Sequence, residues 1–270
     1  MFIRRHEKVL LLDYDGVLAE DLKLDERTII RLKELLGQGF KIAIITGRTP
    51  SRTSELINAL EKHGIADKIS IFCERGCVEL KRSQTEWHAH LNERVKNFKL
   101  EERGEASWIL HKLAEKFGIA KALTNNIVSF YFSSKKAGFK LPELQSTVRK
   151  IVDEINRSGR IKTKLIAIPT QHGMEILPHQ ATKALAAQTF LSRVGKPYYG
   201  FALGDMFADR KMALGPKIKF LPVKSPDEFL KISENLPKLI AERRRKLAKL
   251  LIKRRLRVGL RKLKRKLGRA

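Results

Sequence analysis

The chain has 270 residues, of which 43% are hydrophobic and 31% charged, and this is enough to build a substantial folded core. Its formal net charge is +27. Residues 241–270 hold 15 Lys or Arg against one Glu, so +14 of that charge lies there and +13 lies in residues 1–240. No apolar run approaches the roughly 20 residues that a membrane span needs, and no apolar signal segment stands near the N-terminus.

The two cysteines, Cys73 and Cys77, lie four positions apart. Neither a second cysteine pair nor a matching histidine pair accompanies them, so a zinc site is not expected. We interpret both as structural thiols of a protein in a reducing, cytoplasmic compartment.

Residues 8–18, KVLLLDYDGVL, form the first distinctive segment. Its aliphatic run VLLL, bounded by charged residues, predicts a buried parallel strand. Asp13 and Asp15 follow at a spacing of two, so both carboxylates leave the strand on the same side if the backbone stays extended. Tyr14 then points the other way and is expected to pack. A strand that ends in an Asx turn is an equally good interpretation of this segment alone.

Helices and strands then alternate along the chain. Asp25 is the expected N-cap of a first helix, and Pro50 begins a second one. Apolar strands are predicted at 41–45 and 69–73. Strand, helix, strand, helix, strand with short connections predicts an α/β fold, a doubly wound, Rossmann-like parallel sheet.

The pattern changes near Lys81, and residues 82–175 are predicted to form an inserted α+β module. Residues 1–81 and 176–236 would form the core around it. The predicted elements of the module are helices near 87–98 and 105–117, a strand at 127–134, a helix at 142–158, and strands at 164–169 and 173–177 that could pair as a hairpin.

Polar residues stand at the carboxyl ends of three predicted strands, namely Asp13 with Asp15, Thr46, and Asp205 with Asp209. Lys183 begins a helix that precedes the last of these strands. Because the carboxyl ends of neighbouring parallel strands meet at one edge of a sheet, we expect these side chains to converge. Clustered carboxylates repel each other unless a cation joins them, and oxygen ligands favour Mg²⁺. Carboxylate, hydroxyl, lysine and Mg²⁺ are the groups that phosphoryl transfer through an aspartyl phosphate requires.

These motifs resemble those of phosphatases in the haloacid dehalogenase (HAD) superfamily, over residues 8 to about 220. The similar segments, in order, are LLDYDGVL, Thr46-Gly47-Arg48, Lys183 and GDMFAD. The insertion is similar to the C2B caps of Cof-type and trehalose-6-phosphate-phosphatase-like enzymes. The segments LDYDG, ERG at 74–76 and MEILP at 174–178 are similar to trehalose-phosphatase sequences. The resemblance implies a HAD core with a cap, and hydrolysis of a sugar phosphate (trehalose 6-phosphate-like) or a similar small phosphorylated metabolite.

The resemblance also implies roles for the motif residues. Asp13 would be the nucleophile that attacks phosphorus, and Asp15 the general acid for the leaving oxygen and then the base for water. Thr46 would bind the transferring phosphoryl group, and Lys183 would neutralise its charge.

For the metal, the resemblance implies that Asp205, Asp13 and the backbone carbonyl of Asp15 hold Mg²⁺. Asp209 would lie behind them and orient Lys183 or a metal-bound water. The residues expected to contact substrate are Gly47, Arg48 and Glu175. Glu175 is interpreted equally well as a solvated carboxylate on a strand.

The basic C-terminus, 237–268, is predicted to form one long amphipathic helix. Three interpretations stay open for it: a solubilising tail with leucines packed on the sheet's flank, a segment that makes the protein peripheral to an anionic membrane, and a nucleic-acid-binding segment. An alternative function is therefore a HAD-scaffold binding protein of low activity, tethered by this tail. Ala208, where related enzymes commonly carry Asn or Thr, favours that alternative mildly, whereas the complete set of motif residues favours catalysis.

Overall fold

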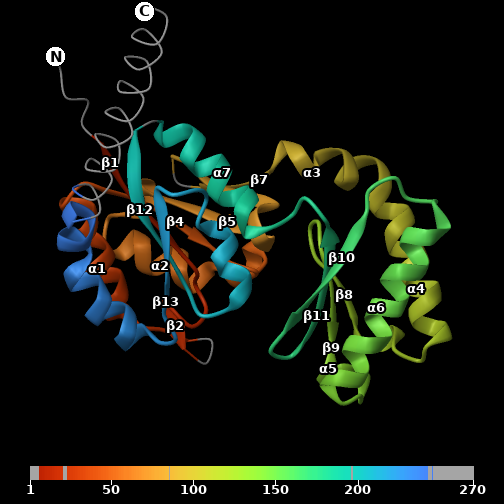
Figure 1. The fold of residues 1–270 in the computed structure, drawn as a ribbon. Coiled ribbons are helices and arrows are strands. Elements are labelled where there is room, and N and C mark those ends of the chain that lie inside the picture. Colours follow the sequence, from red (N-terminus) through yellow and green to blue (C-terminus); the bar gives the residue numbers. More distant parts are fainter. Residues whose placement is uncertain (1–5, 21–22, 85, 196, 243–244, 246–270) are drawn as a thin grey trace, which may run out of the picture.

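The computed structural model describes residues 6–20, 23–84, 86–195, 197–242 and 245, and within these ranges the chain forms two parts with separate sheets (Figure 1). We call the part with the larger sheet the core and the inserted part the cap. In spatial order the larger sheet contains β13 (Ile218–Pro222), β12 (Tyr198–Gly204), β1 (Glu7–Leu12), β4 (Phe40–Ile45), β5 (Ile69–Cys73), β6 (Val78–Ser83) and β7 (Glu86–Leu91). Strands β13 to β5 are parallel, and β6 and β7 join them antiparallel.

Helices cover both faces of the larger sheet, which confirms the predicted doubly wound α/β fold. On one face, Leu10 and Leu12 of β1 join the hydrophobic cluster that contains α1 (Glu26–Gly37) and α2 (Ser54–Lys62). On the other face, Val9 and Leu11 join the cluster that contains α7 (Lys183–Val194). All four β1 side chains are fully buried. Each such burial is worth about 1.5–3 kcal/mol, so the helices fix the position of β1 and of the residues that follow it.

The larger sheet extends past the predicted domain boundary at residue 82, which lies inside β6. The helix predicted at 87–98 is also wrong in its first half, because β7 is a strand and Trp87 pairs with Arg82 of β6. Strand β7 lies at the edge of the sheet and its side chains are largely exposed. An edge strand without a buried face has no alternation of apolar residues that would reveal it. We therefore place the insertion at about 93–178.

The cap is a four-stranded antiparallel sheet covered on one face by helices. Its strands, in spatial order, are β10 (Leu165–Thr170), β11 (Gly173–Pro178), β9 (Phe130–Ser133) and β8 (Leu123–Asn125). Its helices are α3 (Glu93–Asn97), a π-helical turn at Phe98–Glu102, α4 (Arg103–Lys116), α5 (Ser134–Ala137) and α6 (Leu141–Ser158). The predicted hairpin is confirmed, since β10 pairs with β11. In Figure 1 the sheet of the cap lies between α4 and α6 on one side and the core on the other.

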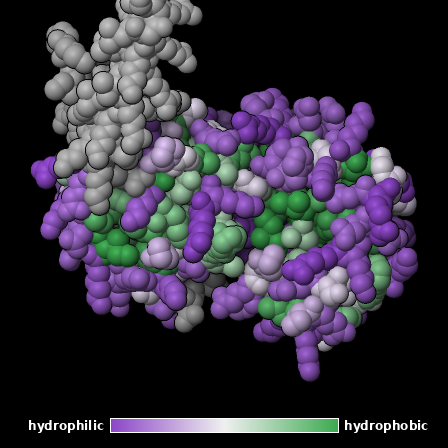
Figure 2. All heavy atoms as spheres, viewed as in Figure 1, coloured by the Kyte–Doolittle hydropathy of each residue, from purple (hydrophilic) through white to green (hydrophobic). Residues whose placement is uncertain are grey.

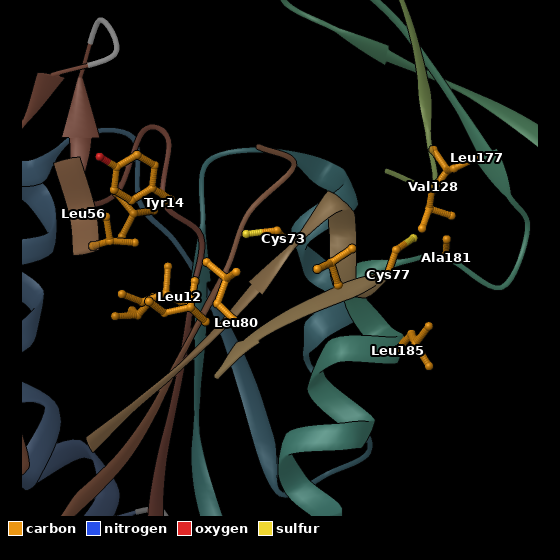
Figure 3. Close-up of a cluster of buried hydrophobic side chains, with 14 of the residues drawn as sticks. Leu12, Tyr14, Leu56, Cys73, Cys77, Leu80, Val128, Leu177, Ala181 and Leu185 are labelled. Carbon is orange, nitrogen blue, oxygen red and sulfur yellow. The ribbon is translucent and has the colours of Figure 1, made fainter. Parts of the chain in front are cut away.

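A continuous hydrophobic cluster joins the two parts (Figure 3). Cys77, just before β6, belongs to it together with Val128 and Leu177 of the cap. Cys73 and Cys77 are buried free thiols, as predicted, and burial raises the pKa of Cys73 to about 12. A thiol with such a pKa stays protonated and unreactive near neutral pH, so both cysteines serve packing.

The last described helix, at 226–242, packs beside α1 and contributes Leu236 and Ile240 to the core. It passes through Pro237, which has no N–H to donate to the carbonyl of Ser233. The guanidinium of Arg31 supplies that donor, with Nη2 2.7 Å from the Ser233 carbonyl oxygen and Nε 2.8 Å from its hydroxyl. The predicted helix at 237–268 therefore begins earlier than expected.

Most of that predicted helix, at 243–244 and 246–268, lies outside the described residues. In the part of the chain that the structure describes, no helix is both long enough and apolar enough to cross a membrane. On the face drawn in Figure 2, hydrophilic side chains predominate among the described residues, with hydrophobic ones gathered in smaller groups.

Candidate active site

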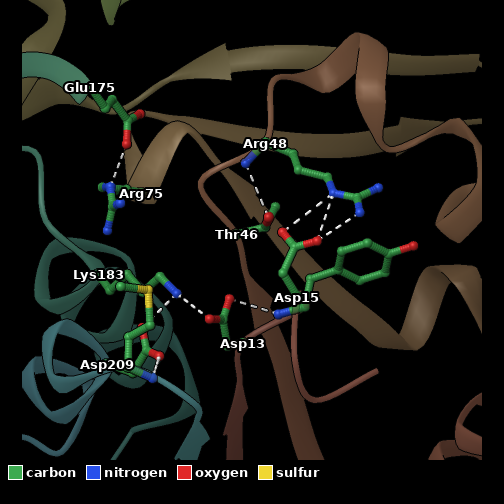
Figure 4. Close-up of polar contacts among 10 residues, drawn as sticks. Asp13, Asp15, Thr46, Arg48, Arg75, Glu175, Lys183 and Asp209 are labelled. Atoms are coloured by element: carbon green, nitrogen blue, oxygen red, sulfur yellow. Dashed lines mark hydrogen bonds and ion pairs between the residues drawn. The ribbon is translucent and has the colours of Figure 1, made fainter. Parts of the chain in front are cut away.

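The centre of the site is a buried lysine held between two aspartates (Figure 4). Asp13 follows β1 and is 5% exposed, and Asp209 lies in the 3-10 helix Phe207–Met212 after β12. Lys183 is the first residue of α7, and its Nζ lies 2.6 Å from Asp13 Oδ2 and 2.6 Å from Asp209 Oδ1. Elements far apart in sequence thus bring three of the predicted site residues into direct contact.

Burial and mutual repulsion disturb the ionisation of these groups. Burial raises the pKa of Asp13 to about 7, although Lys183 opposes the rise. Burial and the charge of Asp209 also raise the pKa of Asp205. For Asp209 burial acts upward too, but the ion pair with Lys183 outweighs it and lowers the pKa. The pKa of Lys183 is raised, since Asp13 and Asp209 outweigh the effect of burial. A further cation is needed for all these carboxylates to be charged together.

The three carboxylates are close enough to share a metal ion. Asp13, Asp205 and Asp209 each offer one oxygen, and these oxygens lie within 4.8 Å of one another. With the single positive charge of Lys183 the fully ionised group carries a net charge of −2, which a divalent cation would balance. An all-oxygen donor set suits a hard cation. The sequence placed Asp209 behind the ligands, whereas the structure brings it into the same cluster while it still contacts Lys183.

Two glycines allow the acidic segments to approach so closely. Gly16 has a φ of +74°, and a Cβ there would lie 2.7 Å from Asp205 Oδ2. At Gly204 a Cβ would lie 2.3 Å from the Cβ of Asp209. Neither position tolerates a side chain, so the glycines of both motifs are required by the packing of the carboxylates themselves.

Asp15 does not lie in the acidic cluster. Its carboxylate forms an ion pair with Arg48, with Arg48 Nη2 2.6 Å and Nε 3.1 Å from Asp15 Oδ1. The Arg48 guanidinium also stacks 4.4 Å from the centre of the Tyr14 ring. Arg48, expected to contact substrate, therefore holds Asp15 in place. Asp15 stays accessible, with 47% of its side chain exposed.

Thr46, at the carboxyl end of β4, is fully buried, and its hydroxyl accepts a hydrogen bond from the backbone N–H of Arg48 at 3.0 Å. The hydroxyl proton remains free to be donated to a neighbouring oxygen. Figure 4 shows Thr46 beside the carboxylate of Asp15.

Glu175 reaches from β11 of the cap into the core. It is 4% exposed, so the interpretation as a solvated carboxylate is wrong. Its Oε2 accepts a hydrogen bond from Arg75 Nε at 2.5 Å. Gly47, the other expected substrate contact, lies close by, because a Cβ on it would be 3.9 Å from Glu175 Oε2.

Glu74 and Arg75, which received no role from the sequence, lie at the junction of core and cap. Both are buried and have left-handed backbones, with φ of 45° and 56°. Such a conformation costs roughly 1–2 kcal/mol per residue with a Cβ. Backbone N–H groups of the turn bond to Arg48 O and Thr46 O at 2.9 Å each. These residues follow β5, so the rule that identified Thr46 after β4 could have found them too.

The side chain of Glu74 fixes the cap to this turn. It accepts hydrogen bonds from the backbone N–H groups of Ile127, Val128 and Ser129, at 3.0, 2.9 and 2.8 Å. One strained turn of the core therefore sends two charged side chains toward the cap, Glu74 to a loop and Arg75 to β11.

The fold, a mostly parallel sheet with an inserted antiparallel cap, is similar to that of several solved structures. Trehalose-6-phosphate phosphatase of Aspergillus fumigatus is similar, with 14% identity, a TM-score of 0.59, and coverage of 87% of this chain and 93% of that one. Truncated IMP-nucleotidase of Plasmodium falciparum has 16% identity, a TM-score of 0.62, and coverage of 87% and 72%.

The C-terminal domain of the trehalose-6-phosphate phosphatase of C. albicans is similar as well, with 17% identity, a TM-score of 0.53, and coverage of 77% and 73%. No protein-family model and no curated protein sequence matches the chain. The likeness to solved structures therefore rests on the arrangement of the elements rather than on residue identity.

Proposed function

We propose that the protein is a Mg²⁺-dependent phosphomonoesterase that acts through an aspartyl-phosphate intermediate. The observation that carries this proposal is the contact of buried Asp13 with Lys183, beside two further carboxylates, at the carboxyl ends of parallel strands. A structural ion pair would not need the surplus of acidic groups that faces it. The similarity to phosphatases of known structure supports the same conclusion.

In the first step, a carboxylate oxygen of Asp13 forms a bond to phosphorus while the bond from phosphorus to the ester oxygen breaks. Asp15 donates a proton to the departing oxygen, which leaves as an alcohol. Lys183 and the hydroxyl of Thr46 stabilise the negative charge of the transferring phosphoryl group. Mg²⁺ bound by Asp13, Asp205 and Asp209 would supply further positive charge and allow these carboxylates to stay ionised together.

In the second step, water attacks phosphorus of the aspartyl phosphate, and Asp15 accepts a proton from that water. The bond between phosphorus and the Asp13 oxygen breaks, which regenerates the carboxylate and releases inorganic phosphate. The exposed position of Asp15 suits both transfers, and Arg48 orients its carboxylate for them. Separate positions for Asp13 and Asp15 thus match the separate tasks of nucleophile and acid–base group.

The proposed substrate is a small phosphorylated metabolite, with a sugar phosphate such as trehalose 6-phosphate as the first candidate. Two of the similar structures are trehalose-6-phosphate phosphatases and another is an IMP-nucleotidase. A screen that includes hexose phosphates, disaccharide phosphates and nucleoside monophosphates distinguishes these classes by their kcat/KM values.

The test is hydrolysis of p-nitrophenyl phosphate with Mg²⁺ by the full chain and by Asp13→Asn. The variant keeps the shape of the side chain and should lose at least about 10³-fold in kcat, because the nucleophile is gone. EDTA should abolish the activity of the parent. Asp153→Asn, at an exposed position of α6, is the matched control and should keep full activity. Turnover by Asp13→Asn close to that of the parent would contradict the proposal. A parent that does not hydrolyse the ester would favour the low-activity binding protein.

A further inference from the structure

The guanidinium of Arg75 is only partly used by the contacts of the described residues. Its Nε donates to Glu175, and among those residues this is the one hydrogen bond that its side chain makes. The two terminal nitrogens carry four further N–H donors. Neither terminal nitrogen is among the fully buried atoms without a partner, so these donors are open to a ligand that enters the site.

These free donors face the acidic cluster. In Figure 4 the guanidinium lies between Glu175 and Lys183, with a terminal nitrogen turned away from Glu175 and toward Lys183. The charge of Arg75 interacts with those of Asp13, Asp209 and Lys183, so these groups lie close together in space. Arg75 therefore stands on the side of Lys183 where the cap meets the core.

The backbone at Arg75 is fixed as firmly as its side chain. Arg75 N donates to Thr46 O at 2.9 Å, which ties it to the residue expected to hold the phosphoryl group. The next residue, Gly76, has a φ of +100°, and a Cβ there would lie 2.8 Å from the backbone nitrogen of Ala186 in α7. The turn is thus locked between the segment of Thr46 and the helix that carries Lys183.

We propose that Arg75 is a second cationic ligand of the substrate phosphoryl group, and that Glu175 of the cap is its positioning residue rather than a contact of the leaving group. A planar guanidinium offers two parallel donors, the geometry that matches two oxygens of a phosphoryl group. Glu175 holds Nε and so directs the terminal nitrogens at the site. This inference rests on the proposed function and adds the residue by which the cap influences phosphate binding.

The test measures orthophosphate binding with Mg²⁺ by calorimetry, together with kcat/KM for p-nitrophenyl phosphate. Arg75→Gln should weaken phosphate binding about tenfold or more and lower kcat/KM about 100-fold, since it removes charged donors to phosphoryl oxygens. Arg75→Lys keeps the positive charge but not the planar guanidinium. It should recover part of the loss in phosphate binding and part of the loss in kcat/KM. Glu175→Gln can still accept from Nε and should lose only about three- to tenfold.

A purely structural ion pair is excluded by a paired variant. Arg75→Met combined with Glu175→Met removes both buried charges and preserves bulk, so its melting temperature should return to near that of the parent. Phosphate binding and kcat/KM should stay as low as in Arg75→Gln. Recovery of both in the double variant would overturn the proposal. Arg193→Gln, which breaks the ion pair with Glu79 between α7 and β6, is the matched control and should leave phosphate binding unchanged.

The outcomes also separate this inference from the function on which it rests. If Asp13→Asn abolishes hydrolysis but Arg75→Gln binds phosphate and turns over as the parent does, the inference fails and the phosphatase stands. If hydrolysis does not depend on Asp13, the proposed function fails. In that case, weaker phosphate binding by Arg75→Gln would still support an anion site at Arg75. Unchanged phosphate binding by Arg75→Gln would overturn the anion site. A Glu175→Gln variant that alters only the ranking of different phosphate esters would overturn the positioning role of Glu175.

Discussion

The core and the cap contribute different kinds of group to the same site. The core supplies Asp13, Asp205, Asp209 and Lys183 from strand ends and a helix start, whereas the cap supplies Glu175 and backbone N–H groups. Parallel strands all end at one edge, so a parallel sheet gathers strand-end residues there. The strands of an antiparallel sheet run in alternating directions and cannot do so. The difference teaches that the core holds the proposed reacting groups, whereas the cap contacts the turn of the core beside them.

Lys183→Met is expected to have the largest effect, because it removes the cation that both buried carboxylates share. Activity should fall by about 10³-fold. The free energy of unfolding without metal should drop by about 3–5 kcal/mol, since the buried carboxylates of Asp13 and Asp209 lose the cation that contacts them both.

Urea unfolding with and without Mg²⁺, together with steady-state kinetics, checks the Lys183→Met prediction. Mg²⁺ should restore part of the stability but not the activity. Arg193→Met, on the same helix but outside the site, is the control and should cost less in both measurements. Equal losses in the two variants would mean that the core site is no different from an ordinary ion pair.

The free energy of unfolding should depend on pH because the pKa of Asp13 in the core site is raised. The folded-state pKa of Asp13 is raised to about 7 from 3.8, so the folded protein keeps a proton that the unfolded chain releases. The metal-free protein should therefore lose stability, on the order of a few kcal/mol, as the pH rises from about 4 to about 7.

Denaturant unfolding at several pH values, compared between the parent and Asp13→Asn, isolates this contribution. The parent and Asp13→Asn should differ in how their free energy of unfolding changes with pH. This difference should shrink or reverse when Mg²⁺ is added, because a bound cation favours the ionised carboxylate. A difference that does not change with pH would contradict the raised pKa.

Glu74→Gln tests the attachment of the cap to the core. The amide can accept hydrogen bonds through one oxygen only, so at least one of the three backbone N–H groups at 127–129 loses its acceptor. We expect a loss of about 1–3 kcal/mol in stability and faster amide hydrogen exchange at 127–129. Exchange in β1 and β4 should stay unchanged. Equal acceleration in cap loop and core strands would show that the turn at Glu74 stabilises the whole molecule rather than the junction.

Tyr14→Phe should have the smallest effect. Tyr14 lies between Asp13 and Asp15 in sequence but is buried, and its hydroxyl has no hydrogen-bond partner among the described residues. Removing a buried, unpaired hydroxyl should leave stability unchanged or raise it by about 1 kcal/mol, with kcat within about twofold of the parent. A large loss of kcat would give Tyr14 a role in the reaction and would contradict the expectation that it serves only packing.

Much of the core could be predicted because its signals are local. The buried runs of β1, β4 and β5, each followed by polar residues, are readable from sequence. In the cap, the apolar stripe of α6 is equally readable. The edge strand β7 was missed because half-exposed edge residues carry no periodicity. The start of the cap was misplaced for the same reason.

The sequence by itself determined which residues stand at the strand ends, because chain connectivity and hydrophobic pattern are enough to place them at one edge of a parallel sheet. Only the tertiary structure decided where their side chains turn. Asp15 pairs with Arg48, Asp209 joins the acidic cluster, and Glu175 meets Arg75. Each of these contacts joins residues that lie far apart in the chain, and a side chain selects its rotamer from the charges and space that folding brings to it.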